Sequence, residues 1–366
     1  MAKSSETIWK IEPHTQIKHE ILRRYLGAWF GILGQKIPRI MYLDGFCGPG
    51  RYIGGEDGSP IIALKEAIKH HSLLQNSEVV FLFIDTNPDR IEHLKQEIAL
   101  LTIPPNFRLI VETGEFHCIL EQIFDQARRA NSNLAPIFAF IDPFGFKGLS
   151  FDLVKQLLQN PHTEVFVNVM IDFVNRFIER SDPQTQQHII DLFGTRQVLD
   201  VIRSGGDRLE ALRRLYLSQL QNHARFVRYF EMRDQRDRVL YYLFFATNHP
   251  LGHARMKEAF WKVDPESGFR FSDATNPNQL VLFEMDSSNA LSELILSAFT
   301  SQKVQVSEIR VFVENQTPYT SSQMKKALRL LEEQDLLCVN PNKVCGKKRR
   351  RGAFPDDAVV EFKVDI

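Results

Sequence analysis

Two short apolar runs in this sequence each end in an aspartate that is followed at once by a tight turn. The first reads Tyr-Leu-Asp-Gly-Phe-Cys-Gly-Pro-Gly over residues 42–50, and the second reads Phe-Ile-Asp-Pro-Phe-Gly-Phe over residues 140–146. A continuous apolar run is typical of a strand that is buried on both faces of a parallel sheet. Such a sheet binds ligands outside the carboxyl ends of its strands, so both aspartates are candidate site residues.

Strands and helices alternate around these runs. Further apolar runs, each preceded by a helical pattern, occupy residues 79–84, 107–111, 137–141 and 165–170. This alternation predicts βαβ units and a parallel sheet. Residues 175–222 break it with helices, and residues 226–246 then read as an antiparallel hairpin. A parallel sheet that ends in a hairpin predicts the α/β fold of class I methyltransferases, with a seven-stranded, Rossmann-like sheet and a helical insertion at about 175–222.

The sequence divides into three predicted parts. Residues 1–265 form the methyltransferase-like domain, and residues 266–290 look irregular and are predicted to be a linker. Residues 291–366 read as three helices followed by a two-stranded wing. That layout predicts a winged helix-turn-helix domain at the C-terminal end.

Composition excludes several classes of protein and partner. The 366 residues carry a formal net charge of zero, so overall charge indicates no partner. The chain shows no signal peptide, no apolar run long enough to span a membrane, and four scattered cysteines. We therefore predict a cytoplasmic protein without membrane contact. The cysteines have no partners at metal-ligand spacing, and neither do His14 and His19, so no metal site is predicted. Both histidines are expected at the surface.

The turn after the first aspartate suits a nucleotide-like cofactor. Its glycines let the backbone pass close to a ligand, and Asp44 is placed to bind the methionine ammonium of S-adenosylmethionine (SAM). Asp85 ends the next strand and suits ribose hydroxyls, and Glu115 or Glu112 follows the third strand and could contact the adenine amine. A phosphate-binding turn, a helix-capping Asp85 and solvated loop acids are the alternatives. The predicted cofactor-binding residues are Asp44, Gly45, Phe46, Gly48, Gly50, Ser59, Asp85 and Glu115.

The turn after the second aspartate predicts the catalytic residues Asp142, Pro143 and Phe144. The Asp142 carboxylate and the Pro143 carbonyl can accept both hydrogens of an exocyclic amine and so direct its lone pair at the SAM methyl. The Phe144 ring can stack on a flipped base. An ordinary Asp-Pro turn is the alternative.

Five consecutive cations lie inside the predicted wing: Lys347, Lys348, Arg349, Arg350 and Arg351. A wing beside a helix-turn-helix runs along a phosphate backbone, so the cluster predicts binding to nucleic acid, either DNA or RNA. A solvated hairpin tip and a localisation signal are the alternatives.

These residues resemble a known family, the bacterial three-Cys-motif partner proteins. The resemblance rests on residues 14–18, 44–50, 57–60, 142–145 and 252–263. It implies a methyltransferase-like domain, a C-terminal winged helix, and a separately encoded partner protein that bears three cysteines.

Two RNA-modifying families share shorter motifs with the chain. Gly50-Arg51-Tyr52 is similar to a turn of the ribosomal-RNA adenine-N6 methyltransferases, although those enzymes have a second proline where this chain has Phe144. Asp-Pro-Phe-Gly at 142–145 resembles the tRNA guanine-N2 dimethyltransferases. The expected function is SAM-dependent methylation of an exocyclic base amine. The alternatives are a non-catalytic nucleic-acid-binding or assembly partner of a three-cysteine protein, and a small-molecule or protein methyltransferase.

Overall fold

The computed structural model describes two compact units. They comprise Met1–Ala259 with Phe269–Gln279, and Phe260–Gly268 with Leu280–Ile366. Within these bounds the structure describes residues 6–145, 148–179, 182–202, 206–273, 288–340, 343–344 and 347–363. No helix in those ranges is both long enough and apolar enough to cross a membrane.

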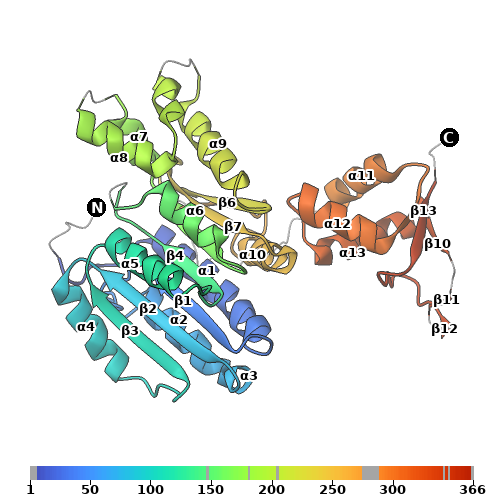
Figure 1. The fold of residues 1–366 in the computed structure, drawn as a ribbon. Helices are drawn as coiled ribbons and strands as arrows, with labels where there is room; N and C mark the ends of the chain where they lie inside the picture. Colours follow the sequence, from blue (N-terminus) through green and yellow to red (C-terminus); the bar gives the residue numbers. More distant parts are fainter. Residues whose placement is uncertain are drawn as a thin grey trace. The chain divides into compact units, whose positions relative to one another are not determined.

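The first unit is built on an eight-stranded sheet in the order β3-β2-β1-β4-β5-β7-β6-β8 (Figure 1). The strands are β1 Arg39–Asp44, β2 Glu78–Asp85, β3 Phe107–Thr113, β4 Ile137–Ile141, β5 Glu164–Val169, β6 Phe226–Arg233, β7 Val239–Thr247 and β8 Arg270–Ser272. β7 runs antiparallel to both β5 and β6, whereas the other neighbouring strands pair in parallel. The predicted class I methyltransferase-like α/β fold is thereby confirmed, but the sheet has one strand more than the seven predicted, because β8 adds to its edge beside β6.

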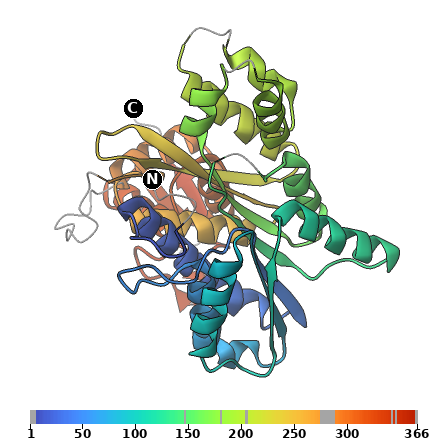
Figure 2. The same ribbon diagram turned by 90° about the vertical axis from the view of Figure 1, so that its left-hand side faces the viewer.

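Helices lie on both faces of the sheet (Figure 2). They are α1 Pro13–Leu33, α2 Ser59–Lys69, α3 His71–Leu74, α4 Pro88–Ala99, α5 Phe116–Arg129, α6 Phe151–Gln159, α7 Ile171–Phe177, α8 Pro183–Phe193, the 3-10 helix η1 Arg196–Ile202, α9 Arg208–Gln221 and α10 Pro250–Val263. β4 shows why these strands read as unbroken apolar runs. Its Ile137 and Ile141 belong to the core on the side of α5 and α6, whereas its Phe138 stacks on Tyr25 of α1 at 5.1 Å. Both faces of the strand are therefore buried.

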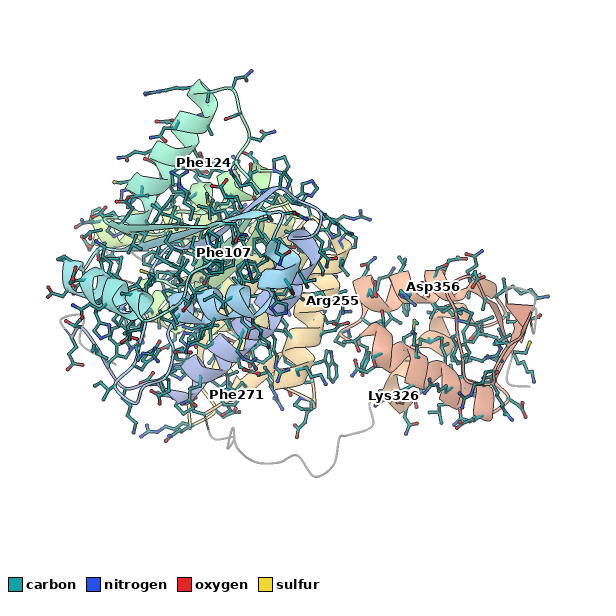
Figure 3. The ribbon with its side chains drawn as sticks, turned by 90° about the horizontal axis from the view of Figure 1, so that it is seen from below. Phe107, Phe124, Arg255, Phe271, Lys326 and Asp356 are labelled. Atoms are coloured by element: carbon teal, nitrogen blue, oxygen red, sulfur yellow. The ribbon has the colours of Figure 1, made fainter. Side chains whose placement is uncertain are left out.

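The structure corrects the start of the predicted linker. Residues 270–272 form β8, which pairs in parallel with β6 at the edge of the sheet. Phe271, labelled in Figure 3, is 6% exposed. A three-residue strand is too short for a periodic signal, so the sequence pattern missed it. Residues 274–287 of the predicted linker lie outside the described residues.

The C-terminal unit has the winged helix-turn-helix layout. Its elements are α11 Ser288–Phe299, β9 Lys303–Gln305, α12 Val306–Gln316, α13 Ser321–Glu333, β10 Leu337–Asn340, β11 Lys343–Val344, β12 Lys347–Lys348 and β13 Val359–Phe362. β10, β13 and β9 form a small antiparallel sheet, and β11 pairs with β12 as a separate hairpin. Leu291, Val313, Leu328 and Val360, contributed by the three helices and β13, meet in one apolar core.

Candidate functional site

A cavity of about 1280 Å³ lies at the carboxyl ends of the parallel strands. Phe46 after β1, Asp85 at the end of β2, Phe116 after β3 and Asp142 after β4 all line it. Pockets for one drug-sized ligand have volumes of roughly 300–1,000 Å³. This cavity therefore has room for a cofactor together with an acceptor group.

Asp142 has polar partners on both carboxylate oxygens. Its Oδ1 accepts a hydrogen bond from Asn168 Nδ2 at 2.7 Å, and its Oδ2 forms an ion pair with Lys18 Nζ. Lys18 comes from α1 and Asn168 from β5, so three separate elements assemble this cluster. The Lys18 side chain is only 6% exposed. Sequence reasoning missed both partners, because neither shares a motif with Asp142.

Phe144 projects from the turn after β4 and is 67% exposed. Its ring meets Trp9 edge-on, with the ring centroids 5.7 Å apart. The turn depends on Gly145, whose φ of 92° lies in the region that favours glycine. Phe144 thus presents an accessible aromatic face at the cavity, as stacking on a planar acceptor requires.

The segment before α1 crosses the same cavity, which the sequence did not reveal. The Trp9 carbonyl accepts a hydrogen bond from Ile53 N–H at 3.0 Å, and the Glu6 carbonyl accepts one from Arg90 Nη2 at 3.2 Å. The Arg90 guanidinium also lies 4.9 Å from the Trp9 ring centroid. These contacts hold Trp9 among the loop after β1, the first turn of α4 and the turn after β4.

The two histidines that were predicted at the surface are not surface residues. His14 is held between Glu12 and Asp273, at 2.9 and 2.8 Å. His19 is buried beside Tyr52, and burial lowers its pKa to about 3, so its imidazole is neutral at ordinary pH. The helical pattern of α1 predicted which side chains share one face of the helix. It did not show that other parts of the fold bury that face.

Asp85 lines the cavity and also holds the glycine-rich turn in place. Its Oδ2 accepts from Gly48 N–H at 3.1 Å and its Oδ1 accepts from Asn87 N–H at 2.8 Å. Gly48 has a φ of 63°, which explains the glycine at this position. Each carboxylate oxygen has a second lone pair, so Asp85 keeps acceptor capacity for a ligand hydroxyl.

Asp44 is fully buried and does not line the cavity. Burial, reinforced by the charge of Asp142, raises its pKa to about 7, against the opposing hydrogen bonds from Ser59 and Phe46 N–H. The described residues form no salt bridge with Asp44, and Tyr42 Oη donates to its Oδ2 at 3.3 Å. A buried carboxylate without a cationic partner suits a cation bound nearby, since such a cation favours its charged form.

The other predicted cofactor residues divide into two groups. Phe46 and Glu115 line the cavity, as do Asp142, Pro143 and Phe144 from the catalytic set. The remaining residues lie outside the lining: Gly45, Gly48 and Gly50 are in the turn after β1, and Ser59 begins α2, where its side chain hydrogen-bonds Asp44. A side chain on Gly45 would approach Phe116 to 2.7 Å, so this glycine allows close packing rather than direct binding.

Two features of the lining were not predicted. Glu115 and His117 of the lining, together with Cys118 next to them in the chain, place three possible metal-ligand atoms within 4.8 Å of one another, although the sequence spacing had suggested no metal site. The lining as a whole is acidic, with seven carboxylates against the cations Lys10, Lys18 and Arg90. Such a lining attracts a cationic ligand.

The wing cations differ in their surroundings. Arg349 forms an ion pair with Glu332 of α13, and its side chain is only 6% exposed. Arg350 and Arg351 are exposed. Lys347 and Lys348 form β12, and their side chains lie outside the described part of the structure. Arg349 therefore stabilises the wing internally, which the run of like charges concealed.

Exposed cations on α13 extend the basic surface toward the wing. They are Lys325, Lys326 (labelled in Figure 3) and Arg329. Arg329 Nε donates to the Gly352 carbonyl at 2.8 Å, which ties α13 to the wing loop. These cations were not predicted as part of a basic surface, because they are spaced along a helix and do not form a consecutive run.

Comparison with known proteins agrees with the fold at the C-terminal end. Residues 270–343 match the family described as GMT-like wHTH domain, so the chain carries a domain of that kind. No curated protein matches the chain.

Several solved structures that resemble the chain are methyltransferases, all of low similarity. An O-methyltransferase from Bacillus cereus in complex with SAH is 17% identical over 65% of this chain and 82% of that chain, with a TM-score of 0.34. A putative O-methyltransferase from Klebsiella pneumoniae is 11% identical over 64% and 88%, with a TM-score of 0.35. PKMT2 from Rickettsia typhi in complex with AdoHcy is 13% identical over 86% and 73%, with a TM-score of 0.29. Likenesses this low say nothing about the reaction or its acceptor.

Proposed function

We propose that this protein is a SAM-dependent N-methyltransferase that acts on an exocyclic amine of a nucleic-acid base. The observation that carries the proposal is one cavity, at the strand ends of a class I methyltransferase sheet, lined by both Asp85 and the Asp142–Phe144 turn. Bound SAM would supply an electrophilic methyl group. The cavity volume is sufficient for the cofactor and a base together.

The cofactor end of the cavity is assigned to the residues after β1, β2 and β3. Asp85 would accept hydrogen bonds from ribose hydroxyls, and Phe46 and Phe116 would pack against the adenine, with Glu115 as a candidate acceptor for its amine. The acidic lining and the uncompensated Asp44 favour the net positive charge of SAM.

The acceptor end is assigned to the turn after β4. Asp142 Oδ2 and the Pro143 carbonyl would accept the two amine hydrogens, while the Phe144 ring would stack on the base. An incoming amine has to displace the Lys18 ammonium from Asp142 Oδ2. Asn168 keeps the carboxylate oriented throughout, since it binds the other oxygen.

Analysis of modified nucleosides tests the proposal directly. The protein is incubated with SAM labelled in its methyl group and with DNA, tRNA or ribosomal RNA from cells that lack it. The digested nucleosides are then analysed by mass spectrometry. We expect label on an exocyclic nitrogen of one base. Label on protein or small molecules alone would leave the fold intact and overturn the base assignment.

SAM affinity is expected to fall as the pH drops below about 7. The pKa of Asp44 is raised to about 7, so below that pH the free protein holds a proton on this carboxyl. A bound cation favours the ionised form, so binding releases the proton and affinity falls by up to about tenfold per pH unit. Calorimetry between about pH 5 and pH 8 measures this effect.

The matched control is Asp44→Asn, which cannot ionise. It should bind SAM more weakly at neutral pH and show a flat profile over the same range. If SAM affinity depends on pH in the same way in the wild type and in Asp44→Asn, the ionisation of Asp44 is not coupled to SAM binding.

The C-terminal unit is proposed to hold the nucleic acid through its wing and α13. Changing Lys347, Lys348, Arg350 and Arg351 to glutamine should weaken binding to all sequences alike. It should also flatten the salt dependence by up to about one logarithmic unit for each phosphate-binding cation removed. Binding titrations at a series of salt concentrations give the slope.

Arg349→Gln is the matched control for the wing. We expect it to destabilise the C-terminal unit and leave the salt slope nearly unchanged, because Arg349 pairs with Glu332. Equal slopes for the wild type and the four-residue variant would mean that these cations touch no phosphate.

One narrower point belongs to the same proposal, and two alternatives to it have their own tests or support. Membership of the three-Cys-motif partner family, and hence a partner protein bearing three cysteines, rests on the motifs at residues 14–18, 44–50, 57–60, 142–145 and 252–263. Co-expression and co-purification of the neighbouring gene product test it. A non-catalytic role predicts no SAM binding by calorimetry. An alkyl-amine acceptor is the second candidate function, favoured by the acidic lining.

A further inference from the structure

Lys18 brings a primary amine to the centre of the candidate site. Its Nζ pairs with Asp142 Oδ2, and its side chain is only 6% exposed. It also lies 5.5 Å from the centroid of the Tyr241 ring. Lys18, Asp142 and Tyr241 all line the cavity.

The burial of the Lys18–Asp142 pair does not by itself show that the pair serves stability. Replacing a buried ion pair by apolar residues is often neutral or stabilising, so a buried pair is weak evidence of a stabilising role. Moreover, Lys18 Nζ pairs with Asp142 Oδ2. The proposed function assigns this same oxygen to the acceptor amine. The amine that the fold itself supplies therefore occupies the acceptor position.

We propose that Lys18 Nζ is itself a methyl acceptor, and that the protein methylates this residue in its own chain. This inference rests on the proposed SAM-dependent activity. It identifies a modification site and a first acceptor of that activity, an alkyl amine within the protein.

The step balances with the groups present. The Lys18 ammonium passes one proton to Asp142, and the freed lone pair of Nζ attacks the methyl carbon of SAM. The N–C bond forms as the S–C bond breaks, and sulfur keeps the electron pair, which leaves S-adenosylhomocysteine. The product is a methylammonium with two remaining protons and no lone pair, so the proton on Asp142 leaves to water.

Methylation would change how Asp142 is occupied. Methylation of lysine keeps the positive charge. Each added methyl nevertheless replaces one of the three N–H donors of the ammonium. A fully methylated Lys18 would keep its charge beside Asp142 but could not donate a hydrogen bond to it, so Asp142 Oδ2 would regain an acceptor position for an external amine.

Lys10 provides an internal control. It lines the same cavity but is exposed, whereas Lys18 is buried on Asp142. Unselective chemical methylation would favour the exposed lysine. Methylation directed by the site would favour Lys18.

The experiment needs only the full-length protein and SAM. Purified protein, before and after incubation with methyl-labelled SAM, is digested and its lysines are mapped by tandem mass spectrometry. We expect methyl groups on Lys18 and none on Lys10. The rate per molecule should not depend on protein concentration, because the amine belongs to the same chain as the site.

Three variants sharpen the test. Lys18→Arg should remove the modification, and Lys10→Arg should keep it. Asp142→Asn should bind SAM by calorimetry but leave Lys18 unmodified. If Lys18→Arg does not fold, the positions of methylated lysines in the wild type and in Lys10→Arg still show whether Lys18 is the site of methylation.

The outcomes separate this inference from the proposed function. SAM binding with Lys18 unmodified, both as purified and after incubation, overturns self-methylation and leaves the cofactor assignment standing. Equal labelling of Lys10 and Lys18 also overturns it. Failure to bind SAM at all overturns the proposed function and this inference together.

Discussion

The Asp142→Asn variant is expected to lose roughly 10²–10⁴-fold in the rate of methyl transfer, the range for removing a positioned group that takes up a proton. Its SAM affinity should stay within about twofold of the wild type, because Asp142 is assigned to the acceptor and not to the cofactor. The asparagine keeps the shape of the side chain and one carbonyl oxygen. Transfer of labelled methyl to nucleic acid gives the rate, and calorimetry gives the affinity.

Two controls isolate the chemical effect. Asp152→Asn changes an exposed carboxylate on α6 outside the cavity lining. It should leave both the rate of methyl transfer and the SAM affinity unchanged. Asp142→Asn also leaves the buried Lys18 ammonium without its carboxylate, which can destabilise the fold. The double variant Lys18→Gln with Asp142→Asn removes both charges and should restore stability without restoring activity. Near wild-type turnover in a folded Asp142→Asn protein would remove the amine-orienting role.

The Asp85→Asn variant is expected to bind SAM roughly ten- to hundredfold more weakly, since a charge-assisted hydrogen bond contributes about 1.5–3 kcal/mol. The amide oxygen can still accept one of the two loop hydrogen bonds from Gly48 and Asn87 N–H. Calorimetry measures the affinity, and thermal unfolding without SAM reports any change in the loop.

Asp89→Asn is the matched control, because Asp89 is an exposed acid in the first turn of α4. It should bind SAM like the wild type. If Asp85→Asn also binds SAM normally while folded, Asp85 serves only to hold the turn through Gly48, and the ribose assignment is wrong.

Local patterns were sufficient to predict the fold and part of the site. The continuous apolar runs predicted buried parallel strands, and the hairpin after residue 222 distinguished a methyltransferase sheet from an all-parallel one. Parallel strands end at the same edge of a sheet, so Asp85 and Asp142 could be expected at one cavity from sequence alone. Both do line it.

Short elements and charge partners were not predictable in this way. β8 has three residues, too few for periodicity to register. In the sequence Arg349 is one of five apparently equivalent cations, but in the structure it forms an ion pair with Glu332. Asp44 was predicted to bind the SAM ammonium, but its complete burial and raised pKa depend on the packing around it and were not predicted.

The sequence by itself determined the order of the elements and the aspartates at the carboxyl ends of β1, β2 and β4, because these depend on residues that are neighbours along the chain. Only the tertiary structure decided what faces those acids. Lys18 reaches Asp142 from a helix far earlier in the chain, and Trp9 meets Phe144 from the segment before that helix. The physical reason is that a helical pattern shows which residues share a face. The groups that this face meets, and the burial and charge pairing that result, depend on how distant segments pack.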